Sequence, residues 1–219
     1  MKTKKSLLVL IIALLPLFVG IGWAADIPEP KFFHGTPHFE PDKEFPGAFI
    51  YRKPEVKASY TKVLIDPIEI WVAEDSEYKG IDPDEAKVIA DNLRQTIVKE
   101  LEPEYPVVEE PGEGVLGIRL AITNVYIKTK KRGLLGYTPI GFVVTAIGNL
   151  AGLRTELNKA TIEAELLDGG SNEQLAALID PLGSDSKEEA SWEELGKRLE
   201  VYAKRLRARL DERTGESSK

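Results

Sequence analysis

The sequence contains no cysteine, and its 219 residues include only two histidines. Without cysteine, disulfides, thiol catalysis and thiolate metal sites are excluded, and so is the lipid that exported lipoproteins carry on a cysteine. The two histidines, His34 and His38, lie in "HGTPH". The glycine and proline between them prevent the display on one helix face that paired metal ligands use. We therefore expect neither a metal nor a cofactor.

Familiar catalytic motifs are missing as well. There is no G-x-S-x-G nucleophile elbow, and "GEG" at 112–114 lacks the third glycine and the strand-to-helix setting of a phosphate loop. Glu163 and Glu165 lie two apart on one predicted strand and could form a carboxylate pair. Their neighbours Lys159 and Thr161 are typical of a solvated strand face. The sequence thus predicts no catalytic residues, with an uncharacterised hydrolase using these carboxylates as an alternative.

The amino-terminal residues 1–24 predict a secretory signal. They combine three lysines, an apolar run from Leu7 to Gly22 and small residues before Ala25. The run is shorter than the roughly 20 residues of a spanning helix and is broken by Pro16, which favours cleavage over anchoring. We therefore expect a periplasmic or secreted protein, with membrane association as a further possibility.

The charge balance is acidic, with 29 lysines and arginines against 36 aspartates and glutamates. Removing the three lysines of the signal leaves 26 basic residues (29 − 3) and a net charge of −10 (26 − 36). Such a chain is repelled by phosphate backbones and anionic lipid surfaces at long range. Nucleic acid is therefore not an expected partner.

Residues 25–58 hold six of the fourteen prolines and predict an extended, proline-rich arm whose aromatic residues lie against the domain. Residues 59–212 form the predicted single domain, and 213–219 a disordered tail. Within the domain, "YTKVLIDPIEIWV" changes its apolar parity across Asp66 and Pro67, which predicts a bulge. The sequence therefore predicts an extended arm that is followed along the chain by one folded domain.

Helix and strand signals then alternate along the domain. Asp82 and Pro83 predict the start of a helix that ends before Pro103, and Ser191 caps a second helix. The strands are "YPVVEE", "VLGIRLAITNVYI", "KATIEAELLD" and "EQLAALID", with a hairpin turn at "GGSN". We expect a two-layer α+β domain in which two main helices pack on a mixed four- to five-stranded sheet. The basic residues Lys204, Arg205, Arg207 and Arg209 are expected on a solvated face at the carboxyl end of the second helix.

Three segments, "YTKVLIDPIEIW", "VVEEPGEGVLGIRLAITNVYI" and "ATIEAELLDGGSNEQLAALID", together resemble a bacterial family of exported lipoproteins catalogued as a domain of unknown function, DUF3313. The resemblance covers most of residues 50–212 and implies no established activity. This chain departs from the family in lacking a lipidation cysteine. The element order is also similar to that of the amino-terminal domain of TolB and of other envelope adaptors, which implies an adaptor role by analogy of fold.

An uncharged segment, "GYTPIGFVVTAIGNLAG", lies within an insert at 133–153. A helix over residues 139–151 would be about 20 Å long, short of the roughly 30 Å needed to span a membrane. Its bulky apolar residues, the interaction candidates of this sequence, are Ile140, Phe142, Val143, Val144, Ile147 and Leu150. They could be covered by the domain itself, by a protein partner, or by shallow membrane insertion with "KTKKR" at the headgroups.

The sequence as a whole predicts a non-enzymatic periplasmic or envelope-associated domain that acts by protein interaction or as an assembly accessory factor. Its expected partner is an envelope protein or a second copy of the chain. The alternative is a peripheral membrane-binding protein that uses the insert.

Overall fold

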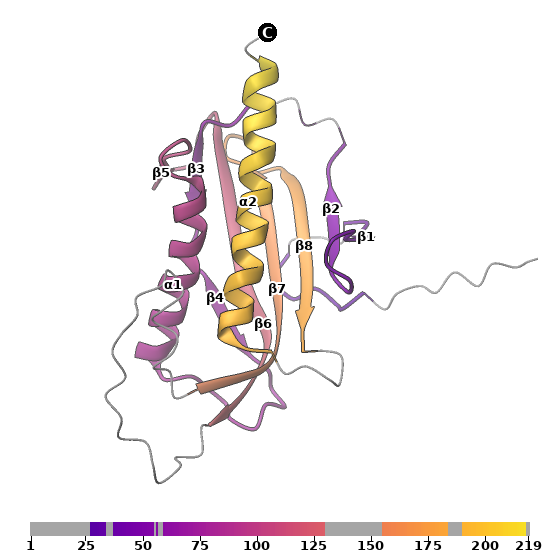
Figure 1. Cartoon of the computed structure of the whole chain (residues 1–219), viewed down its shortest axis with the longest axis vertical. Helices are drawn as coiled ribbons and strands as arrows, with labels where there is room; N and C mark the ends of the chain where they lie inside the picture. The colour runs from indigo at the N-terminus through magenta and orange to yellow at the C-terminus, as the bar shows by residue number, and fades with distance from the viewer. Residues whose placement is uncertain are drawn as a thin grey trace, which may run out of the picture.

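A computed structural model describes residues 27–33, 37–54, 56, 59–129, 155–183 and 190–217, with side chains up to residue 213. These residues form a mixed sheet with two long helices on one face (Figure 1). The helices are α1 (Pro83–Leu101) and α2 (Trp192–Ser217). The strands are β1 (Glu40–Pro41), β2 (Phe49–Arg52), β3 (Lys62–Ile65), β4 (Glu69–Val72), β5 (Val107–Val108), β6 (Val115–Thr129), β7 (Thr155–Asp168) and β8 (Gln174–Leu182).

The predicted α+β class is confirmed, but the sheet has eight strands rather than four or five. Its order is β1-β2-β8-β7-β6-β3-β5, and β4 also pairs with β6. Strands β6, β7 and β8 form the antiparallel centre, and β3, β4 and β5 are joined in parallel. The additional strands come from the arm and from division of one predicted strand into two.

That division is the predicted bulge. Ile65 in β3 is opposite Ile118 in β6, whereas Glu69 in β4 is opposite Ala121. The chain therefore advances four residues (69 − 65) against three on its partner (121 − 118), so one residue is extra. Proline at 67 fits here because this position needs no ladder donor.

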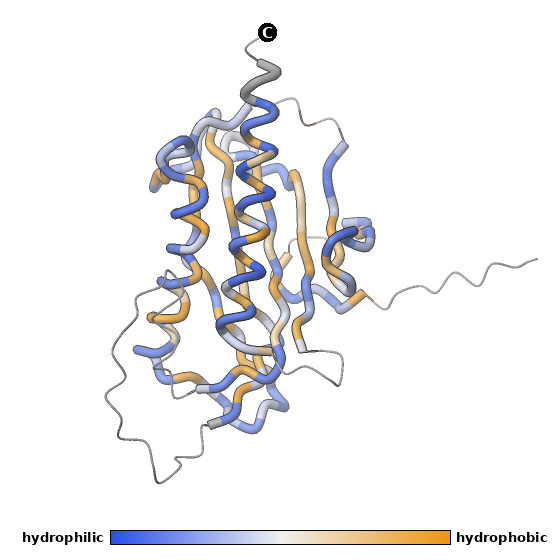
Figure 2. Tube along the Cα trace, in the orientation of Figure 1, coloured by the Kyte–Doolittle hydropathy of each residue, from blue (hydrophilic) through white to orange (hydrophobic). Residues whose placement is uncertain are grey.

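Both helices begin where the sequence predicts. The Asp82 carboxylate accepts the backbone N–H groups of Asp84 and Glu85 at 2.9 and 3.4 Å, and Ser191 Oγ accepts the N–H of Glu194 at 3.0 Å. These caps satisfy donors that the first helical turn leaves without partners. Blue and orange residues alternate along both helices in Figure 2, as expected for helices with one apolar face on a sheet.

The carboxyl end of α2 differs from the prediction. The helix runs to Ser217, so residues 213–217 are helical and do not belong to a disordered tail. No proline interrupts this stretch, and the Arg213 guanidinium donates to the backbone carbonyl of Val56 at 2.9 Å. A contact with the distant arm therefore holds the end of the helix against the domain.

The arm is extended, as predicted, and also joins the main sheet. Strand β2 pairs antiparallel with β8, from Phe49 opposite Ile179 to Arg52 opposite Ala176. The four residues of β2 contain no proline, so their backbone donors remain available for a sheet ladder. The aromatic residues Phe39 and Phe49 are buried with Ile179, on the sheet face opposite the helices.

Candidate binding groove

The sheet is wider than its two helices can cover. Packed helices lie about 8–10 Å apart, whereas neighbouring strands are about 4.8 Å apart, so two helices cover roughly four strands. In Figure 1, α1 and α2 lie over the β3, β4, β6 and β7 side, and no helix lies over the β8–β2 end. This mismatch leaves a groove between α2 and the helix-facing side of β8 and β2.

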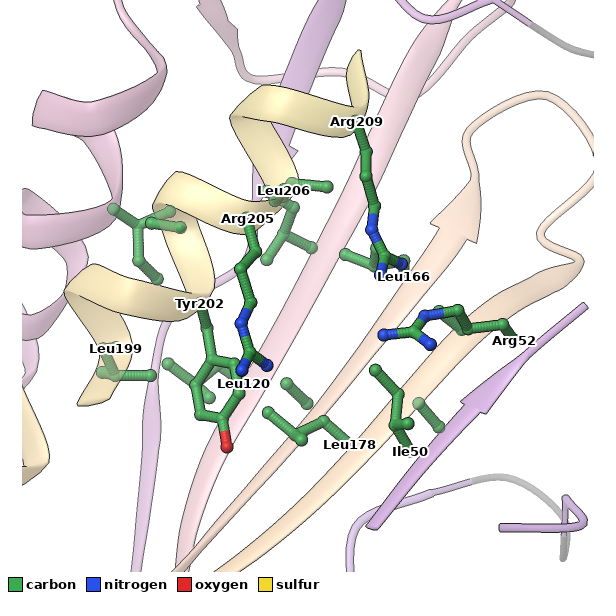
Figure 3. Close-up of a pocket in the computed structure, with 16 residues that line it drawn as sticks. Ile50, Arg52, Leu120, Leu166, Leu178, Leu199, Tyr202, Arg205, Leu206 and Arg209 are labelled. Atoms are coloured by element: carbon green, nitrogen blue, oxygen red, sulfur yellow. The ribbon is translucent and has the colours of Figure 1, made fainter. Parts of the chain in front are cut away.

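The groove has a cavity volume of about 130 Å³ and a mainly aliphatic lining (Figure 3). The large apolar side chains that line it are Ile50, Leu120, Leu166, Leu178, Leu199 and Leu206. Among the described residues of the lining, those with polar side chains are Arg52, Tyr202, Arg205 and Arg209. None of these described residues is a serine, threonine, histidine or carboxylate, so this part of the lining offers binding surface and no nucleophile or general base.

The three arginines at the rim differ in their partners. Arg205 pairs with Asp42, with Nη1 3.1 Å from Oδ2, and also with Glu44. Arg52 and Arg209 form no hydrogen bond or ion pair with the described residues, and their guanidinium groups lean toward each other across the groove (Figure 3). Burial against the groove and the charges of Arg52 and Arg205 lower the pKa of Arg209. Arg52 and Arg209 therefore bring two positive charges together at the rim, whereas Asp42 and Glu44 offset the charge of Arg205.

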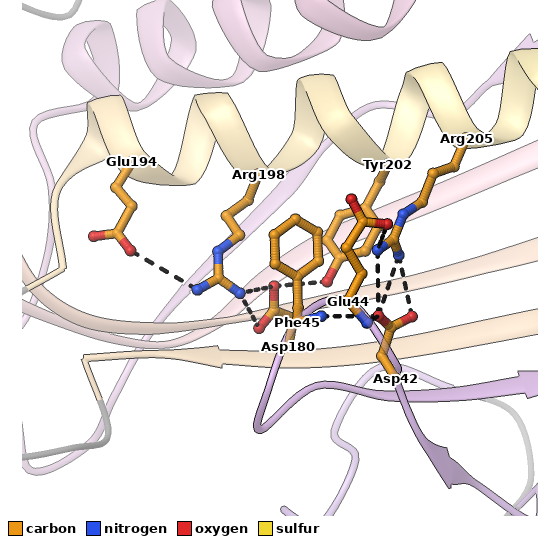
Figure 4. A network of polar contacts seen from close by, with 8 residues as sticks. All are labelled: Asp42, Glu44, Phe45, Asp180, Glu194, Arg198, Tyr202 and Arg205. Carbon is orange, nitrogen blue, oxygen red and sulfur yellow. Dashed lines mark hydrogen bonds and ion pairs between the residues drawn. The ribbon is translucent and has the colours of Figure 1, made fainter.

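A polar network holds α2 next to this groove (Figure 4). Asp180, fully buried on β8, accepts two hydrogen bonds from Arg198 Nη1 at 3.0 and 3.1 Å and one from the Tyr202 hydroxyl at 2.8 Å. Burial raises the pKa of Asp180 against the opposing influence of these two donors. Burial, together with the Asp180 carboxylate, also raises the pKa of Tyr202. The network fixes α2 over β8.

The arm adds an aromatic contact to the same network. The centroid of the Phe45 ring lies 4.5 Å from Cζ of Arg198 and 4.8 Å from Cζ of Arg205. The same ring packs edge-on against Tyr202, with the two ring centroids 5.1 Å apart. Guanidinium groups bind favourably to the face of an aromatic ring. The arm therefore helps to position Arg205 at the groove.

The opposite face of the sheet corrects the interpretation of Glu163 and Glu165. Both are buried, with 1% and 2% of their surface exposed, because the arm covers this face. The Glu163 carboxylate accepts the backbone N–H groups of Lys31 and Phe32 at 2.9 and 3.0 Å, and Glu165 pairs with Arg119. Alternation correctly placed the two carboxylates on one strand face, but it could not show what covers that face.

A family model described as "Protein of unknown function (DUF3313)" matches residues 33–206. The chain belongs to this family. The match spans most of the arm, the sheet and α2 as far as Leu206. No curated protein sequence matches the chain.

Among solved structures, two of the PelC dodecamer from Paraburkholderia phytofirmans are similar to this DUF3313 chain. One has 10% sequence identity and a TM-score of 0.38, and covers 72% of this chain and 96% of PelC. The other, a single-residue variant, has 9% identity and a TM-score of 0.37, and covers 73% and 97%.

The interaction candidates Ile140, Phe142, Val143, Val144, Ile147 and Leu150 lie outside the described residues. Of the two histidines, His34 also lies outside them, and His38 is exposed. Among the residues with described side chains, no three histidines, cysteines or carboxylates are placed to hold a metal ion. In the same part of the chain, neither helix is long and apolar enough to cross a membrane.

Sequence reasoning missed the groove and assigned the basic residues of α2 to one solvated face near the helix end. That assignment is wrong, because α2 continues to Ser217 and its last turn holds no basic residue. Lys204 faces solvent and pairs with Glu200, but Arg205 and Arg209 turn toward the groove. Their spacing of four beside an apolar stripe was a signal that could have separated them from Lys204.

Proposed function

We propose that this chain is a non-enzymatic, exported binding domain of the cell envelope, and that the groove beside α2 receives an apolar guest. The observation that carries this proposal is the groove itself, whose lining is aliphatic apart from three arginines and a tyrosine. A concave apolar surface with a few polar groups at its rim is typical of a binding site.

The placement of the buried carboxylates supports a binding role over hydrolysis. Glu163 is occupied by the arm backbone, Glu165 by Arg119, and Asp180 by Arg198 and Tyr202. Each is on a face of the sheet covered by the arm or by α2. A carboxylate that already accepts several hydrogen bonds is a poor general base.

Binding in the groove can be tested with N-phenyl-1-naphthylamine, a neutral apolar dye whose fluorescence rises on burial. We expect saturable binding to the wild type and at least tenfold weaker binding to Ala176→Leu, which fills part of the lining. Gln95→Leu adds the same side chain on the exposed face of α1 and is the matched control. Equal binding by all three proteins would show that the dye uses another surface.

Export requires its own measurement. The proposal expects the mature protein in the periplasm or the medium, with a mass that corresponds to a chain starting at Ala25. Cell fractionation measures the location, and mass spectrometry of the intact protein measures where the mature chain begins. A full-length chain retained in the cytoplasm would contradict the envelope location without bearing on the groove.

A protein partner, whether an envelope protein or a second copy, remains part of the proposal and rests on the sequence of the insert. The element order predicted from the sequence, which resembles that of the amino-terminal domain of TolB, supports it by analogy only. Crosslinking in intact cells with the wild type and Val144→Asp tests the insert. Identical partner sets would count against the insert as the contact surface.

A further inference from the structure

The apolar groove and two arginines that pair with none of the described residues occur at the same place. Arg52 comes from β2 and Arg209 from α2, so each side of the groove contributes one guanidinium to the rim. We propose that the groove binds a single acyl chain with a carboxylate head group, and that Arg52 and Arg209 hold the carboxylate. This inference rests on the proposed binding function and names the guest.

The charge at the rim favours an anionic guest. The guanidinium groups of Arg52 and Arg209 lean toward each other and repel, and the pKa of Arg209 is lowered by burial and then by the charge of Arg52. A carboxylate placed between them would accept charge-assisted hydrogen bonds, which are often bidentate with arginine. Arg205 has a different role, because Asp42 and Glu44 already neutralise it.

The volume favours one chain. At about 130 Å³ the cavity is close to the roughly 150 Å³ of an engineered apolar cavity that admits benzene, so it accepts a few methylene groups and not two full acyl chains. Leu206 and Leu166 also line the groove and would contact the methylene groups of the guest (Figure 3). A two-chain phospholipid would leave one chain in water.

The donors and acceptors of the lining argue against a peptide guest. The guanidinium groups only donate hydrogen bonds, and the Tyr202 hydroxyl already donates to Asp180. A peptide brings backbone N–H groups, which would be buried with no carboxylate among the lining side chains to accept them. A carboxylate with an alkyl chain has acceptors at one end and no donors, which matches the site.

The test uses isothermal titration of the protein, as the cells produce it, with decanoate, decanol and decyltrimethylammonium below their micelle concentrations. The three probes share one chain and differ in head-group charge. We expect decanoate to bind at least tenfold more tightly than decanol, and the cation to bind most weakly. Octanoate should bind more weakly than decanoate, by about fourfold for each methylene that the groove buries.

Variants assign the head-group site. Arg52→Gln and Arg209→Gln should each weaken decanoate binding by about tenfold to a hundredfold, the range for a lost charge-assisted hydrogen bond, and leave decanol unchanged. Arg52→Lys and Arg209→Lys keep the charge but not the bidentate geometry, so each should weaken decanoate binding less than the corresponding glutamine variant does. Arg94→Gln, which removes a positive charge from α1 outside the groove, is the matched control. Circular dichroism verifies that each variant is folded.

The remaining outcomes separate failure of the carboxylate assignment from failure of the groove as a binding site. Equal binding of decanoate and decanol, unaffected by the arginine variants, overturns the carboxylate assignment and leaves the apolar groove of the proposed function standing. Competition by inorganic phosphate as strong as by decanoate shows an anion site that needs no acyl chain, which also overturns the inference. If neither decanoate nor the neutral dye binds, the proposed groove function fails together with the inference.

Discussion

Replacing Arg198 with methionine removes the cation that faces a buried carboxylate. Asp180 is fully buried, and Arg198 donates two of the three hydrogen bonds that it accepts. Breaking a buried ion pair by removing one partner costs about 3–5 kcal/mol, because the remaining charge is uncompensated. Loss of the guanidinium over Phe45 adds about 0.5–1 kcal/mol. We therefore expect Arg198→Met to lower the free energy of unfolding by about 3.5–6 kcal/mol at pH 7.

The pH dependence separates this mechanism from simple loss of packing. Burial already raises the pKa of Asp180, and Arg198 and Tyr202 oppose that rise, whereas the charge of Asp42 adds to it. A carboxyl whose pKa is higher in the folded than in the unfolded state supports folding at low pH, and this support is lost as pH rises through the folded-state pKa. Without Arg198 the pKa rises further, and each unit adds about 1.4 kcal/mol to the difference between acidic and neutral pH.

Urea unfolding, followed by far-ultraviolet circular dichroism, gives the free energy of unfolding of the wild type and of Arg198→Met at pH 4.5 and pH 7. The comparison requires that the free energy of both proteins falls with the same slope in urea. The destabilisation should be smaller at pH 4.5, where a protonated Asp180 needs no cation. The double variant Asp180→Asn with Arg198→Met should lose this pH dependence, because no charge remains to be compensated. A cost below about 1 kcal/mol at pH 7, or the same cost at both pH values, would refute the reasoning.

Two further predictions concern the arm and a turn. Glu163→Ala removes the acceptor of two backbone N–H groups at Lys31–Phe32, so we expect about 1.5–3 kcal/mol less local protection there, measured by hydrogen exchange, and little change in Glu163→Gln. Gly183→Ala should destabilise by more than about 2 kcal/mol in thermal unfolding, since φ is +69° and the new Cβ would lie 2.6 Å from the Asn158 carbonyl oxygen. Gly80→Ala, with nothing within 4 Å, should be neutral or stabilising, and equal shifts in the two glycine variants would contradict the argument.

Local features were predictable because their causes are local. The caps of α1 and α2 depend on side chains within three residues of the helix start, and the bulge after Ile65 follows from a parity change visible in the sequence. The same holds for the β7–β8 hairpin, whose turn uses adjacent glycines. In each case the residues that determine the structure are neighbours in the chain.

The burial of Glu163 and the groove could not be predicted in this way. Glu163 is buried by backbone groups more than 130 positions away, and Arg52 meets Arg209 only because β2 adds to the edge of the sheet beside β8. Period-two alternation assigns a strand face but carries no information about the element that later covers it. The groove depends on the width of the sheet relative to two helices, which emerges only when all strands are counted.

The pairing of β2 with β8 has a consequence for the order in which the molecule can assemble. Arg52 is opposite Ala176, so the four-residue strand β2 must wait for 124 residues (176 − 52) of further chain before its partner exists. Contacts this distant in sequence form late, because the loop between them has to close first. During synthesis, β2 therefore has no partner in the main sheet until β8 has been made. The native sheet closes only when the carboxyl-terminal part of the chain arrives.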